Sequence, residues 1–237
     1  MINRKSDTKL VIDAPINFNT NTTLETHQSF TSGITSTNEI YGLIPAITQG
    51  NNDWQRDGND IQPTSLTTKV NLNIVSRMDS SASIYADVYF LTSKQVKDFS
   101  LTNTIPTAQL MNVGDGTNAP YDGTSFTAML PINKSQFNVI AHKRILLQKG
   151  KGNPNDIYRP GDIYQTASDT FIYSRSFAVK IPLPTKFLYQ DSTKSYPSNY
   201  FPFMVVGFHA TDQEGDGALT SAILRVQAQS HLYFKDI

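Results

Sequence analysis

The chain has 237 residues, of which 38% are hydrophobic and 17% charged, and its 20 basic and 20 acidic side chains give a formal net charge of zero. The absence of cysteine excludes disulfides and thiolate metal sites, and the balanced charge argues against a strongly basic nucleic-acid-binding domain. We expect no signal peptide and no membrane span, because the N-terminal segment is polar and the longest strongly apolar run, residues 201–208, is too short to cross a bilayer. These features predict a soluble protein.

Alternation of apolar and polar side chains predicts β-strands along most of the chain. The expected strands cover residues 64–76, 83–91, 137–148, 171–183, 201–209 and 221–234. In the first of them Leu66, Val70 and Leu72 alternate with Lys69, as in a strand that buries one face.

Three segments depart from this simple alternation. Residues 201–209 are almost entirely apolar, which predicts a strand buried on both faces. A bulge is expected near Ala141 and His142, where the alternation slips. Helical spacing is confined to residues 92–99, where Ser93 is a potential N-cap.

Long polar connections separate the expected strands. They cover residues 102–118, 149–169, 190–198 and 211–217. Connections of this length suit strands that cross between two sheets at opposite ends of a sandwich. The pattern predicts an all-β fold, an eight-stranded antiparallel jelly-roll sandwich with long inter-strand loops and one short helix.

Motifs of enzymes and metalloproteins are weakly represented. Asp212, Glu214 and Asp216 have the spacing of the start of a calcium loop, but Ile223 stands where an EF-hand needs glutamate. An acidic hairpin loop is the alternative. The histidines lack ligand spacing and no Gly-x-Ser-x-Gly elbow is present. We therefore expect no cofactor and no enzymatic activity.

Residues 42–74 form the most informative stretch. A polar, turn-rich segment containing Gln49-Gly50, Gln55-Arg56 and Gly58 leads into the first long strand, an arrangement that matches no catalytic motif. Its tryptophan, Trp54, is either a contact residue for a nucleotide or a subunit, or a core residue capping the sandwich.

Several basic residues fall on expected strands. They are Lys69, Lys143, Arg144, Arg175 and Lys180. Two interpretations stay open: a basic inner face for phosphates, or solvated strand residues that discourage aggregation.

Five blocks in order resemble the capsid proteins of small circular single-stranded DNA viruses, the circovirus-like group, and more distantly the single-jelly-roll shells of small plant RNA viruses. The blocks are residues 49–61 with the strand that follows through residue 74, then 84–91, 137–147, 176–184 and 231–236. Together they span roughly residues 40 to 236. One departure is Asp57, which stands where the pattern has an aliphatic residue.

The resemblance implies a viral capsid protein that self-assembles into a small icosahedral shell enclosing a single-stranded DNA genome. It implies a short N-terminal arm over residues 1–20 and one jelly-roll domain over residues 21–237. The implied partners are further copies of the chain, the viral nucleic acid and a host receptor, with no membrane. The implied location is the virion, with assembly in the host nucleus.

Candidate nucleic-acid contacts come from the arm, the opening loop and one strand. They are Arg4, Lys5, Lys9, Trp54, Arg56, Lys143 and Arg144. Many related shells have a long arginine-rich arm, whereas the first 20 residues here contain three basic side chains. Because attachment scales with the phosphates neutralised, three charges give weak, salt-sensitive binding.

Aromatic side chains are frequent in the expected loops, which suits contacts between subunits. The candidates are Tyr121, Phe126, Tyr158, Tyr164, Tyr189, Tyr196 and Tyr200. The alternative function is a lectin-like jelly-roll module that uses the same aromatics, with Asp and Asn, to hold a sugar. Oligomeric state distinguishes the two.

Overall fold

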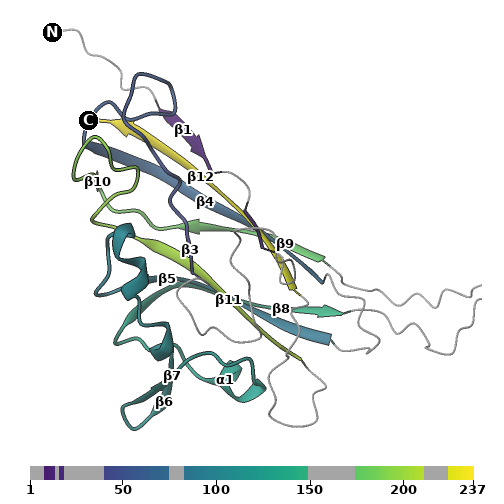
Figure 1. Cartoon of the computed structure of the whole chain (residues 1–237). Helices are drawn as coiled ribbons and strands as arrows, with labels where there is room; N and C mark the ends of the chain where they lie inside the picture. The colour runs from purple at the N-terminus through teal and green to yellow at the C-terminus, as the bar shows by residue number, and fades with distance from the viewer. Residues whose placement is uncertain (1–7, 14–15, 19–39, 75–82, 149–173, 211–223) are drawn as a thin grey trace, which may run out of the picture.

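Two antiparallel β-sheets pack face to face in the computed structural model, which describes residues 8–13, 16–18, 40–74, 83–148, 174–210 and 224–237 (Figure 1). The first sheet contains β1 (Lys9–Ile12), β2 (Ile16–Phe18), β4 (Asp60–Ile74), β9 (Ser174–Ile181), β10 (Phe187–Leu188) and β12 (Leu224–Asp236). The second contains β3 (Ile40–Gly42), β5 (Ser83–Ser93), β8 (Phe137–Gln148) and β11 (Pro202–Ala210).

The strand order is that of a jelly roll. The first sheet runs β1-β12-β4-β9 and the second β3-β11-β5-β8, with β2 beside β1 on β12 and β10 beside β9 on β4. Numbered along the chain, the eight principal strands give the orders 1-8-3-6 and 2-7-4-5. All but one of the connections cross between the sheets, as in a double Greek key. The predicted all-β jelly-roll sandwich is confirmed.

Most predicted strands coincide with observed ones. β4 buries Leu66, Val70 and Leu72 and exposes Lys69, as the alternation predicted. β8 has the predicted bounds and a bulge: Leu91 of β5 pairs with Val139 and Phe90 with Ala141, which leaves one residue of β8 unpaired beside the predicted position.

A second core explains why β5 and β11 are buried on both faces. Val206 and Phe208 point into the sandwich, whereas Phe203 and Val205 point to the other side of the second sheet. That side is covered by residues 94–136, which contain η2 (Phe99–Thr104), η3 (Thr107–Gln109), β6 (Met111–Gly114), β7 (Thr117–Ala119) and α1 (Ser125–Met129) (Figure 1). Gly207 is needed here, because a Cβ would lie 2.5 Å from Tyr121.

The predicted helix over residues 92–99 is wrong in position. β5 continues to Ser93, whose hydroxyl accepts the N–H groups of Gln95 and Val96 and turns the chain. The Lys94 N–H then bonds the Gln136 carbonyl at 2.9 Å, so the backbone extends the strand pairing instead of starting a helix. Within the described residues the only α-helix is α1, which Thr124 caps.

Part of the predicted N-terminal arm belongs to the sandwich. β1 pairs with the last strand along residues 231–234, and β2 pairs with residues 226–228 of the same strand. Residues 9–12 therefore form an edge strand of the first sheet. Within the described part of the chain, no helix is long and apolar enough to cross a membrane.

Candidate contact surfaces

Arg56 in the opening loop is buried and holds two loops together. Its guanidinium donates to the carbonyl oxygens of Asp191 at 2.8 Å, Lys194 at 2.9 Å and Gly58, and lies 4.2 Å from the centre of the Tyr189 ring. These bonds use both terminal nitrogens of the guanidinium, which a phosphate would need. The predicted nucleic-acid contact at Arg56 is therefore wrong, because a buried side chain bonded to backbone carbonyls cannot reach a ligand.

Lys9 is also engaged within the chain. Its ammonium lies 2.7 Å from Asp236, 3.0 Å from Asp57 and 2.8 Å from the Gln55 carbonyl. Burial opposes its charge, but the bonds to Asp236 and Asp57 prevail and raise the pKa of Lys9. Asp57, the departure from the capsid pattern, is thus an ion-pair partner of Lys9. The structure contradicts the predicted phosphate contact at Lys9, because two carboxylates already neutralise it.

The other predicted nucleic-acid residues lie in different places. Trp54 is 57% exposed, so the core interpretation is wrong and the contact interpretation stays a prediction. Lys143 is exposed on β8, whereas Arg144 pairs with a buried aspartate. Arg4 and Lys5 lie outside the described residues.

Only some of the predicted subunit-contact aromatics lie at the surface. Tyr121 and Tyr189 are buried, which contradicts their predicted role, because the loops that carry them fold back onto the sandwich. Tyr196 stacks on Phe99 and the Tyr200 hydroxyl donates to the Pro182 carbonyl; both rings are half-buried. Phe126 is 56% exposed. The remaining candidates, and the predicted acidic loop, lie outside the described residues: Tyr158, Tyr164, Asp212, Glu214 and Asp216.

A buried polar network joins α1 to the second sheet. Asp87 of β5 is fully buried and accepts from Arg144 Nε at 2.8 Å and Nη2 at 3.2 Å, while His142 Nε2 lies 2.8 Å from the same carboxylate. The Tyr121 hydroxyl lies 3.1 Å from Asp87. Arg144 also donates to the carbonyl of Ala128 in α1.

The network keeps Asp87 ionised. Burial opposes the charge, yet the bonds from His142 and Arg144 prevail and hold the pKa of Asp87 below its usual range. One signal of this network is visible in the sequence, an aspartate within the otherwise apolar strand 84–91. It could not identify the partners, because the pairing of Asp87 with Arg144 depends on the register of β5 and β8.

The burial of His209 is expected to lower the stability of the folded chain in mild acid. The ring lies beside Asp87 and Tyr121, and desolvation lowers its pKa below the ordinary value of 6.5. The unfolded chain therefore binds this proton at a higher pH than the folded chain does, so stability falls as the pH drops below about 6.5. We expect urea midpoints at pH 7.5 and 5.5 to differ less in His209→Gln than in the natural chain. An unchanged difference would contradict the assignment.

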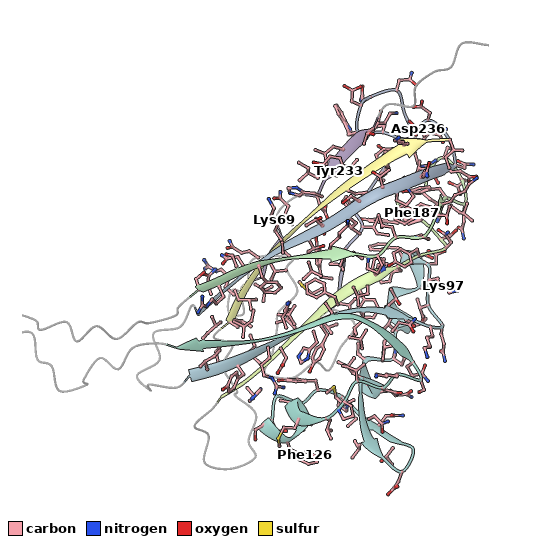
Figure 2. All side chains as sticks on the ribbon, turned by 180° about the vertical axis from the view of Figure 1, so that it is seen from behind. Lys69, Lys97, Phe126, Phe187, Tyr233 and Asp236 are labelled. Carbon is pink, nitrogen blue, oxygen red and sulfur yellow. The ribbon has the colours of Figure 1, made fainter. Side chains whose placement is uncertain are left out.

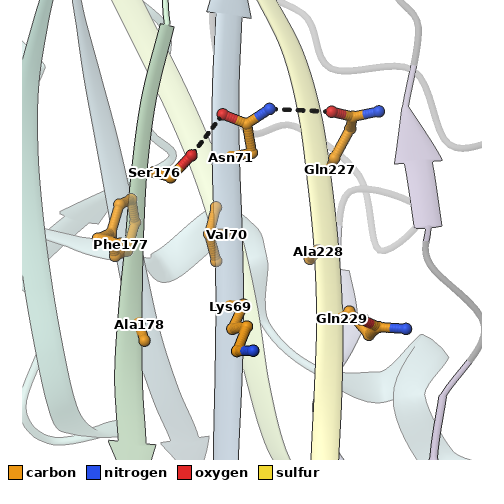
Figure 3. Close-up of a pocket in the computed structure, with 9 residues that line it drawn as sticks. All are labelled: Lys69, Val70, Asn71, Ser176, Phe177, Ala178, Gln227, Ala228 and Gln229. Carbon is orange, nitrogen blue, oxygen red and sulfur yellow. Dashed lines mark hydrogen bonds between the residues drawn. The ribbon is translucent and has the colours of Figure 1, made fainter.

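The outward side of the first sheet carries a regular polar surface, which we call the polar face. Its residues form four rows across β9, β4 and β12: Lys180, Thr67 and His231; Ala178, Lys69 and Gln229; Ser176, Asn71 and Gln227; Ser174, Asn73 and Arg225. Ser176 donates to Asn71 at 2.9 Å, and Asn71 donates to Gln227 at 3.0 Å (Figure 3). Beside this ladder the residues line an open hollow of about 500 Å³.

The polar face only partly matches the predicted basic inner face. Lys69 and Lys180 lie on it, but Lys143 and Arg144 belong to β8 in the other sheet. Arg175 pairs with the inward-pointing Leu72, so its place in the register is on the opposite side of β9.

Two groups of neighbouring apolar side chains are exposed on different parts of the molecule. The edge patch consists of Leu10 and Ile12 of β1 with Tyr233 of β12, where Leu10 and Tyr233 are cross-strand neighbours. The helix patch consists of Phe126 and Met129 of α1, which are 56% and 73% exposed. Tyr233 and Phe126 lie at opposite ends of the molecule in Figure 2.

Among the described residues, no group of three or more His, Asp or Glu side chains is arranged to hold a metal.

The sequence matches no protein-family model and none of the curated proteins with which it was compared. Among solved structures it is similar to a chain of the full particle of Israeli acute paralysis virus heated to 63 degrees. The TM-score is 0.33 and the identity 8%, over 96% of this chain and 68% of that chain.

Proposed function

We propose that this protein is the structural subunit of a self-assembling shell, a capsid protein that forms a small icosahedral particle. The observation that carries the proposal is a jelly-roll sandwich with apolar patches at opposite ends. Apolar side chains that are grouped on a surface mark contact sites more often than single exposed ones do. Two different patches allow head-to-tail contacts, which close into rings and shells when the rotation permits.

The mechanism is geometric and involves no reaction. The sandwich is the rigid unit, and internal bonds such as those of Arg56 and Asp87 fix the segments that surround it. Burial of the edge and helix patches against neighbouring subunits supplies the association energy, at about 25 cal/mol per Å² of apolar surface.

The sequence resemblance supports a finer proposal. It favours a circovirus-like virion as the location and single-stranded DNA as the enclosed genome.

Gel filtration of the purified full chain tests the proposal against the lectin-like alternative. A shell subunit elutes as a megadalton species, whereas a sugar-binding module elutes as a monomer or small oligomer. The absorbance ratio at 260 and 280 nm across the same peak reports packaged nucleic acid. A monomer at every concentration would contradict the shell.

A further inference from the structure

We propose that the polar face of the first sheet binds single-stranded nucleic acid. The inference rests on the proposed function in that it assigns the surface that contacts the cargo. Its evidence, however, is the charge and chemistry of twelve side chains.

The charge of the polar face is of one sign. Its formally charged residues are Lys69, Lys180 and Arg225, and none of its twelve residues is Asp or Glu. In a chain with a net charge of zero, this segregation creates a local positive surface. Such a surface is complementary to a polyanion.

Lys69 and Lys180 are available for a ligand. Both are exposed, and among the described residues neither has an ion-pair partner, in contrast to Lys9 and Arg144. They lie on adjacent strands and two residues apart in register, which places their backbones about 7–8 Å apart. Two ammonium groups at this separation can contact phosphates of one flexible strand.

The remaining side chains favour nucleic acid over a sulfated polysaccharide. The amides of Asn71 and Gln229 each use one N–H within the chain, toward Gln227 and the Asp13 carbonyl. A second N–H of each, and the amide nitrogen of Gln227, stay available for the exposed edges of unpaired bases. A duplex would hide its base edges from this open face.

The open hollow makes part of the polar face concave. It lies where the short side chain of Ala178 stands in one row with the longer side chains of Lys69 and Gln229 (Figure 3). The Ser176-Asn71-Gln227 ladder fixes the amides beside it, so little side-chain freedom is lost on binding.

The test measures binding of a fluorescent 15-nucleotide oligo(dT) to the full chain by anisotropy at several salt concentrations. Each phosphate contact with a single strand contributes about 0.7 to the salt slope. The double variant Lys69→Gln, Lys180→Gln is therefore expected to lower the slope by about 1.4 and to weaken binding about 25-fold at 0.1 M salt.

Lys97→Gln is the matched control, because Lys97 is exposed and lies on another side of the molecule (Figure 2). It is expected to bind like the natural chain. Equal loss in Lys97→Gln and in the double variant would overturn the proposal, as would no loss in the double variant. Preferential binding of a heparin oligosaccharide that depends on Lys69 would also overturn it. Unchanged thermal unfolding confirms that the variants fold.

Sedimentation of the same samples separates this inference from the shell proposal. Oligonucleotide binding that depends on Lys69 in a chain that never assembles upholds the inference and contradicts the shell. Particles that form normally while the double variant binds as well as the natural chain contradict the inference alone.

Discussion

Replacing both helix-patch residues with glutamate is expected to abolish particles while leaving the subunit folded. Thr127 and Ala128 of α1 are buried, whereas Phe126 and Met129 point away from the sandwich. Surface substitutions of this kind change the free energy of unfolding by about 0.5 kcal/mol or less. Burial of two such side chains contributes about 3–6 kcal/mol to a contact, so its loss weakens each contact at least about 100-fold.

Sedimentation velocity and circular dichroism measure the two effects separately. The variant Phe126→Leu, Met129→Leu keeps the patch apolar and is expected to assemble. Lys97→Glu changes the net charge by the same two units as the glutamate pair and is also expected to assemble. Normal particles from the glutamate pair would show that α1 is not a subunit contact.

Arg144→Met is expected to be the most destabilising single substitution among the residues described above. It leaves the fully buried Asp87 carboxylate without its bidentate partner and removes the bond to the Ala128 carbonyl. Breaking a buried ion pair from one side costs about 3 kcal/mol or more. For a chain of this length, that corresponds to a fall in Tm of about 6–12 °C.

The stability lost in Arg144→Met is expected to depend on pH. In the natural chain the pKa of Asp87 is depressed, so its contribution to stability is present above the unfolded pKa and lost as the pH falls through the folded pKa. Without Arg144 that pKa rises, and protonation relieves the buried charge. The stability difference between the two chains should therefore narrow from pH 7 to pH 4.

The double variant Asp87→Asn, Arg144→Met is the control for this experiment. It removes both charges, and we expect it to regain part of the lost stability. Urea unfolding at both pH values gives the comparison. A deficit that grows towards pH 4, or one below about 1 kcal/mol at pH 7, would show that the network does not anchor α1.

The two sheets were largely predictable, because a long strand repeats the alternation of apolar and polar side chains several times. β4 has 15 residues and β12 has 13, enough for alternation to appear. β1 and β3 have four and three residues and were not predicted, because so few residues cannot establish a period. Their assignment depends on pairing with β12 and β11, which lie far away in the sequence.

The contact residues were less predictable, because residue type does not determine which way a loop folds. Tyr121 and Phe126 lie five residues apart in the connection between β7 and β8, yet one is buried against Asp87 and the other is exposed. Arg56 was predicted to contact phosphate because it is a basic residue in a polar loop. In the structure its guanidinium donates to carbonyl groups more than 130 residues further along the chain. Lys69 and Lys180 were identified from strand alternation, and the structure places both on one face.

Negative-stain electron microscopy of the purified full chain tests the central proposal most directly. We expect closed, uniform particles, and we expect them to disappear in Phe126→Glu, Met129→Glu while Phe126→Leu, Met129→Leu retains them. A field of single subunits from the natural chain, at concentrations and salt conditions where sedimentation also finds only monomer, would contradict the assignment of this protein as a shell subunit.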